Sequence, residues 1–218
     1  MKKLPLLVIG ALTVASCIAG ATYIWVTDTC VTDTCRERKQ MEFEAISETK
    51  WVRAKSDFRS QLDFQLNLLG DIHDKSEVKY NELQSIYSYE VSTLFSEYNM
   101  GTSSDYMPPV YHAAVRKEEK NELAFTNIKE NHESLSELIK YSISEIESFD
   151  VRIQKNAAQS AKSKIDEVGQ KFMNLIEIYK NSKLVDQSYI DKRLSVFNNY
   201  TQKSKNSYDD YQKHISSK

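Results

Sequence analysis

The chain has 218 residues, of which 28% are charged, and its formal net charge is −2. Acidic and basic residues are interleaved along it, as is typical of solvated helix faces, which excludes a nucleic-acid partner. The three cysteines have no histidine near them in the sequence. Because a closed zinc site needs about four ligands, we expect no metal and no other cofactor.

The N-terminal segment is a candidate membrane anchor. Two lysines precede an uncharged run from Leu4 to Val26, which ends near a tyrosine and a tryptophan. About 20 apolar helical residues span a bilayer, and aromatic rings prefer its interfaces. Residues 1–26 are therefore predicted to form an uncleaved, single-pass signal anchor. Because positive charges stay in the cytoplasm, the rest of the chain is expected in the bacterial periplasm.

A lipid anchor is the alternative for the same segment. Residues 14–17 read Val-Ala-Ser-Cys, which resembles the lipobox of bacterial lipoprotein precursors and makes Cys17 a lipidation candidate. Cleavage there would leave the apolar residues 18–26 at the new N-terminus, which favours the uncleaved anchor. Both alternatives attach the chain to a membrane.

A perfect tandem repeat of Val-Thr-Asp-Thr-Cys follows the anchor at residues 26–35. Threonine and aspartate compete for backbone hydrogen bonds, so residues 27–40 are predicted to be a linker. In an oxidising compartment Cys30 and Cys35 are disulfide candidates, which could close a small loop or join two parallel chains.

The first long helical arm is predicted over residues 41–98. Between Arg36 and Tyr98 the only helix breaker is Gly70, and an apolar stripe in steps of three and four keeps its phase through it. We therefore expect one bent helix in preference to two. The stripe consists of Phe58, Leu62, Gln65, Leu69, Ile72, Ser76, Tyr80, Leu83, Tyr87, Val91, Leu94 and Tyr98.

A chain reversal is predicted over residues 99–112, where glycine, proline, serine and asparagine gather. Aromatic and methionine side chains at this tip have no core of their own and are suited to touching a partner. The interaction-tip candidates are Tyr106, Met107, Pro108, Pro109 and Tyr111.

A second long arm is predicted over residues 113–185 and a third helix over 186–218. The stripe of the second arm slips at the small residues 156–161, where a neighbouring helix could approach or the arm could bend. Asp186 is a cap candidate for the third helix. That helix carries serine and threonine at core positions, so we expect it to pack loosely.

The sequence thus predicts an all-α fold, in which an N-terminal membrane anchor helix is followed by an elongated antiparallel helical hairpin, a coiled-coil bundle of about three helices. In plan alone this is similar to phage inner-membrane spanins and to several envelope assembly proteins. No residue's role follows from that similarity.

No catalytic motif stands out, so we predict no enzymatic activity. Asp71, His73 and Asp74 form the densest group of ionisable side chains, and His112 lies beside the tip, but their spacings match no catalytic pattern. His132 is expected on the solvated surface. An enzyme would need a buried site that joins one of these histidines to carboxylates of another helix.

The leading hypothesis is a membrane-anchored, extracytoplasmic coiled-coil protein, acting as an envelope scaffold or protein-interaction module. It is expected to self-associate through its coiled coil and to bind an unknown envelope protein partner. A helical ligand-sensing domain is the alternative, which a compact four-helix bundle with a pocket would favour.

Overall fold

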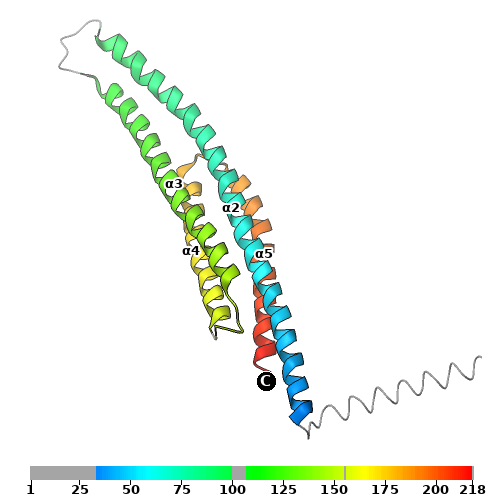
Figure 1. The fold of residues 1–218 in the computed structure, drawn as a ribbon. Coiled ribbons are helices and arrows are strands. Elements are labelled where there is room, and N and C mark those ends of the chain that lie inside the picture. Colours follow the sequence, from blue (N-terminus) through cyan, green and yellow to red (C-terminus); the bar gives the residue numbers. More distant parts are fainter. Residues whose placement is uncertain (1–32, 100–106, 155, 218) are drawn as a thin grey trace, which may run out of the picture. The chain divides into compact units, whose positions relative to one another are not determined.

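The computed structural model describes residues 33–99, 107–154 and 156–217. They form four α-helices and no strand: α2 (Asp33–Asn99), α3 (Pro109–Ser148), α4 (Ala157–Ser182) and α5 (Gln187–Ile215) (Figure 1). The all-α prediction is confirmed for this part of the chain. The predicted anchor, with Cys17, Cys30 and Tyr106, lies outside the described residues. No described helix combines the length and apolar character that crossing a membrane requires.

The chain divides into two units between Thr49 and Lys50, and α2 passes from one to the other. In the first unit the helix begins at Asp33, so the predicted linker over residues 27–40 is wrong for its second half. An aspartate in the first turn favours a helix start electrostatically, and it pairs with Arg36 at 3.6 Å. Cys35 is disulfide-bonded, while its pairing with Cys30 stays a prediction.

The second unit, residues 50–218, corrects the prediction of one continuous second arm. The region 113–185 forms two antiparallel helices, because α3 ends at Phe149 with an extended backbone and α4 begins only at Ala157. The Phe149 carbonyl oxygen accepts hydrogen bonds from Trp51 Nε1 at 3.2 Å and from Lys55 Nζ at 3.0 Å, which fixes this reversal against α2. The bundle thus contains four helices where about three were expected.

The slip in the apolar stripe marks this reversal. Ala157, Ala158 and Ala161 are buried, and their small side chains let α4 pack against α3. Ile153 lies in the turn, where 81% of its surface is exposed, although residues 113–185 were expected to be one helical arm. The small residues therefore predicted a close helix contact correctly. The turn, however, begins before these residues in the sequence.

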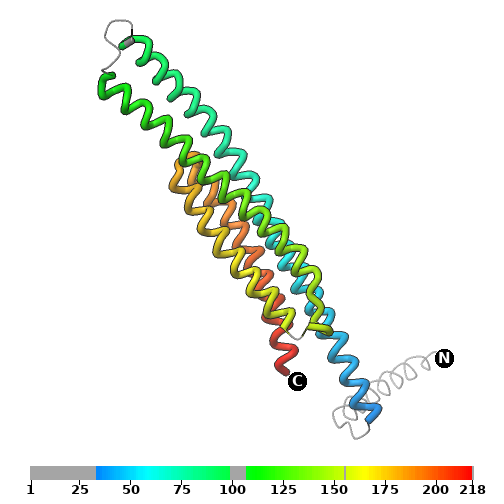
Figure 2. The backbone as a smooth tube through the Cα atoms, turned by 60° about the vertical axis from the view of Figure 1, so that its left-hand side comes forward, coloured from blue at the N-terminus to red at the C-terminus, as the bar shows by residue number. Residues whose placement is uncertain are grey.

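The α4–α5 hairpin lies beside only part of the longer α2–α3 hairpin, as both views show (Figures 1 and 2). The base, where all four helices meet, holds the apolar core. Its largest fully buried side chains are Trp51, Phe58, Leu62, Leu68, Leu69, Ile72, Ile128, Ile139, Ile146, Phe172, Ile176 and Tyr179. Beyond Ser76, no described residue of α2 is buried.

The helix α5 packs more closely than its sequence suggested. Asp186 caps it by accepting a hydrogen bond from Ser188 N at 2.8 Å. Ser204 and Ser207 are buried, and their hydroxyls donate to the side chains of Gln61 and Asp57 on α2. The prediction that this helix packs loosely is therefore wrong, because its buried polar side chains hydrogen-bond to buried polar side chains of α2.

Gly70 lies within the unbroken α2, and no heavy atom comes within 4 Å of a Cβ added there. We expect Gly70→Ala to raise the free energy of unfolding by about 0.5–1 kcal/mol, because alanine loses less backbone entropy in a helix. Urea denaturation followed by circular dichroism measures this difference. Unchanged or lower stability would show that the glycine has a role that helix propensity does not explain.

Candidate functional site

The first candidate site is the open arm, defined as residues 80–99 of α2 and 109–125 of α3. Here the two helices pair with each other, through Tyr80 stacked on Phe125 at 4.2 Å and Phe95 beside Tyr111 at 6.2 Å. The contacts of α4 and α5 with α2 reach only to the beginning of this arm (Figure 2). One face of the helix pair is therefore uncovered.

The uncovered face continues the surface that α5 covers in the base. On α2, α5 contacts Asp57, Gln61, Phe64, Asp71 and Lys75, which follow one another in steps of three, four or seven residues. The same spacing leads on to the positions 78, 82, 85 and 89, and the neighbouring row through Phe58, Gln65 and Ile72 leads on to position 86.

Apolar side chains occupy several of these exposed positions. Val78, Ile86 and Tyr89 have 62%, 59% and 73% of their surface exposed, while the positions 82 and 85 are held by glutamate and serine. Large apolar side chains that follow one another on a helix face mark a contact surface more often than isolated ones do. Residues 80–99 contain no lysine or arginine, and their charged residues are Glu82, Glu90 and Glu97.

The predicted interaction tip lies at the end of this arm. Met107 and Pro108 are half-buried, and Pro109 begins α3 after the extended Pro108. Tyr111 packs within the hairpin, beside Phe95 and His112, so it contributes to holding the two helices together. The role of the tip in binding stays a prediction. Phe95, Tyr98 and Val110 are exposed near the tip, and Ile86 and Tyr89 are exposed farther down the arm.

A second candidate site lies where the four-helix base ends. The Tyr179 hydroxyl lies 3.3 Å from Nδ1 of His73 and 3.3 Å from Nδ1 of His132, and the two imidazole rings stack at 4.2 Å. A hydroxyl has one hydrogen, so it donates to one ring and accepts from the N–H of the other. Burial raises the pKa of Tyr179, which keeps this hydroxyl protonated.

The charge of His132 is disfavoured in this cluster. Burial and the neighbouring His73 lower its pKa from 6.5 to about 4, and the smaller opposing effects of Glu133 and Asp74 do not compensate. The expectation of a solvated His132 is therefore wrong. The sequence placed this histidine among charged residues, but the tertiary packing turns it towards Tyr179 on α4.

The ionisable residues that stood out in the sequence do not converge on one site. Asp71 pairs with Arg193 on α5, whereas His73 faces His132 and Tyr179. His112 contacts Tyr111 at the far end of the arm. Within residues 33–99, 107–154 and 156–217, no three His, Cys, Asp or Glu side chains are placed to hold a metal ion.

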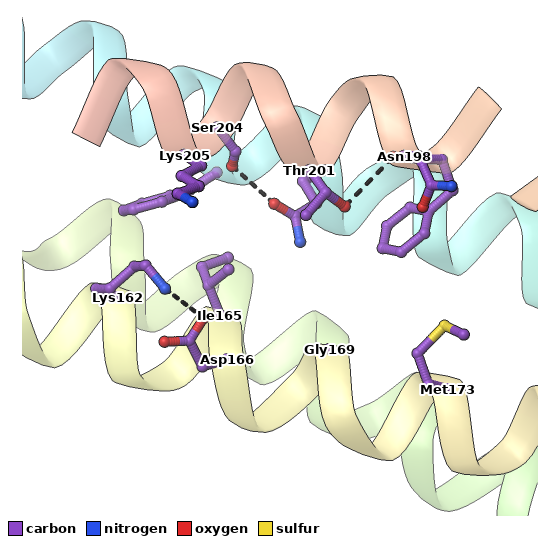
Figure 3. Close-up of a pocket in the computed structure, with 12 residues that line it drawn as sticks. Lys162, Ile165, Asp166, Gly169, Met173, Asn198, Thr201, Ser204 and Lys205 are labelled. Carbon is purple, nitrogen blue, oxygen red and sulfur yellow. Dashed lines mark hydrogen bonds and ion pairs between the residues drawn. The ribbon is translucent and has the colours of Figure 1, made fainter. Parts of the chain in front are cut away.

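The third candidate site is a half-open cavity of about 570 Å³ between α2, α4 and α5 (Figure 3). Its walls combine buried apolar side chains, Phe58, Ile165 and Phe197, with the polar pair of Gln61 and Ser204. Cavities of this size commonly hold small molecules. Sequence patterns gave no signal for it, because its lining comes from three separate helices.

A comparison with protein-family models, with curated proteins and with solved structures found no match to this chain in any of the three.

The histidine cluster predicts a pH-dependent stability. Because the pKa of His132 is about 4 in the folded chain against 6.5 ordinarily, the unfolded chain binds more protons between these values. Stability is therefore complete above pH 6.5 and decreases as the pH falls towards 4. We expect the melting temperature to fall by roughly 2–5 °C over this range from this group.

The variant His132→Phe keeps an aromatic ring against His73 but cannot be protonated, so its melting temperature should depend less on pH. Differential scanning calorimetry at pH 7.5 and pH 5 measures this, with His112→Phe as the matched control on the exposed surface. Equal pH dependence in the His132→Phe variant and the unmodified chain would contradict the assignment.

Proposed function

We propose that this chain is a non-catalytic, membrane-anchored helical scaffold of the bacterial envelope, which self-associates through the open arm. The single observation that carries the proposal is the exposure of Ile86 and Tyr89 on the arm, at positions that continue two neighbouring rows of α2, one of which contacts α5 in the base. Exposed apolar side chains at the spacing of a helix–helix contact favour binding of another helix.

A second copy of this chain is the partner that the arm favours. In the base, an α2–α3 hairpin is covered by another helical hairpin, α4–α5. The open arm of a second copy is also a pair of helices that can cover such a hairpin. In a two-fold contact between identical faces, each copy covers the uncovered face of the other. The arm of one copy would thus complete a four-helix bundle with the arm of the other.

The arrangement of the base favours an antiparallel pair. On each copy, the α4–α5 hairpin lies on α2 and α3 where the open arm begins, and its Tyr189 contacts Lys75 there. Two parallel copies placed face to face would set both α4–α5 hairpins in the same space. In an antiparallel pair, the tip of each arm instead approaches the α4–α5 turn of the other copy. The N-terminal ends of the two α2 helices then lie at opposite ends of the pair, so the pair would lie along one membrane or join two membranes.

The double variant Ile86→Asp with Tyr89→Asp tests the contact. Two charges in place of these apolar side chains should weaken self-association by about a hundredfold or more, because buried unpaired charges are costly. Size-exclusion chromatography with light scattering of the detergent-extracted full chain measures it. The matched control is Ile153→Asp, which changes an equally apolar, 81% exposed residue in the α3–α4 turn.

A dimer that persists in the double variant would place the contact elsewhere, and a monomeric unmodified chain would refute self-association. The pairing direction has its own test in a chain with Cys30 and Cys35 changed to serine. The further substitution Ser96→Cys places a thiol near the tip. In an antiparallel pair the two thiols are far apart and should form no disulfide, whereas in a parallel pair they should oxidise readily and link the two copies.

The attachment to the membrane belongs to the same proposal and rests on residues 1–26. We expect an uncleaved chain of full-length mass in the membrane fraction, because the apolar run continues for nine residues beyond Cys17. Intact-mass spectrometry of the extracted protein, beside a Cys17→Ala variant, measures this. A mass that begins at an acylated Cys17, and is lost in the variant, would replace the spanning anchor with a lipid anchor.

A further inference from the structure

The cavity between α2, α4 and α5 contains a buried polar group with unused hydrogen-bonding capacity. Gln61 is 3% exposed and its Oε1 accepts a hydrogen bond from Ser204 Oγ at 2.7 Å. Its amide nitrogen has no partner among the described residues, although the side chain lines the cavity. This nitrogen keeps access to solvent through the cavity, so an acceptor on a bound molecule can replace water as its hydrogen-bond partner.

Positive charge gathers at the same end of the cavity. Figure 3 shows Lys162 on α4 and Lys205 on α5 at the end where Ser204 lies, and Lys162 pairs with Asp166. Among the residues that line the cavity, two lysines against one aspartate leave an excess of one positive charge. An anionic acceptor, such as a carboxylate, satisfies both the amide of Gln61 and this charge.

The rest of the cavity is apolar and elongated. From Lys162 the lining of α4 continues through Ile165 and Gly169 to Met173, a rise of about 16 Å along the helix. Phe58 and Phe197 complete the walls. At Gly169 the absence of a side chain leaves open space, since no heavy atom lies within 4 Å of a Cβ added there.

We propose that this cavity binds a monocarboxylate with a linear apolar chain, with the carboxylate at Gln61 and Lys205 and the chain extended along α4 towards Met173. The proposal does not rest on the open arm, whose residues are not part of the cavity. It assigns a ligand class to the base of the bundle, in line with the alternative of a ligand-sensing domain.

Octanoate is the probe, and Met173 is the reporter. The full chain is labelled with ¹³C at the methionine methyl groups and held in nanodiscs, so that Met41 serves as an internal control outside the cavity. We expect a saturable shift of the Met173 methyl signal with octanoate and no comparable shift of Met41. Octan-1-ol, which lacks the carboxylate, should bind at least about tenfold more weakly.

Two variants test the geometry. Gln61→Leu removes the amide donor at nearly constant volume and should weaken octanoate binding by about tenfold without affecting octan-1-ol. Gly169→Leu fills the apolar channel and should abolish binding of both, as measured by calorimetry. Its matched control is Gly70→Leu, which places the same side chain at the other open helical glycine and should leave binding unchanged.

Several results would overturn the proposal. They are the absence of a saturable shift at Met173, equal affinity for octanoate and octan-1-ol, or unchanged affinity in Gly169→Leu. Circular dichroism of each variant verifies that the helices are retained. Self-association of the arm is measured separately, so failure of this proposal and failure of the scaffold proposal give different results.

Discussion

The structure depends on a mismatch in helix length. The helices α4 and α5 contain 26 and 29 residues, whereas α3 contains 40 and α2 contains 67. Apolar surface is stabilised when it is removed from water, and four helices remove more of it than two. The apolar core therefore forms where α4 and α5 are present, and the α2–α3 hairpin continues beyond them with one face uncovered.

The uncovered arm is held together by a different kind of contact. In the described part of the arm, Ala114 and Asn121 are the buried residues, and Asn121 Nδ2 donates to Gln84 Oε1 at 3.0 Å. Polar bonds and half-buried aromatic rings specify how the two helices pair, but they remove little apolar surface from water. Binding of a further helical layer would stabilise this arm more than the base, which already has its core.

Polar core positions shape the base as well. Asp57 and Gln61 on α2 bind Ser207 and Ser204 on α5, and Lys203 also pairs with Asp57 at 3.0 Å. Such bonds fix the register of α5 on α2, since a slide by one turn would leave each group buried without its partner. Short serine side chains contribute little volume beside Gly169 of α4, and the cavity lies there.

Periodicity predicted the fold class and much of the core, but not the register between helices. Phe58, Leu62 and Leu69 are buried as the stripe of the first arm predicted, because a helical stripe depends only on spacing along one chain. Trp51, which is 2% exposed, was missed, since its burial depends on the Phe149 carbonyl of another helix. Tyr98 was expected in the core but is 40% exposed, because no third helix reaches the arm.

The candidate sites show even more clearly that periodicity along one chain does not predict which residues of different helices meet. Their residues come from helices far apart in the sequence, such as His73, His132 and Tyr179, and single-chain patterns contain no information on which residues face each other. Burial of such polar groups is unfavourable unless they pair with one another. Here they pair at the level where α4 ends and the open arm begins, so the structural boundary between base and arm coincides with a group whose charge depends on pH. Protonation of His132 would therefore weaken the base next to the surface through which the chain is proposed to associate.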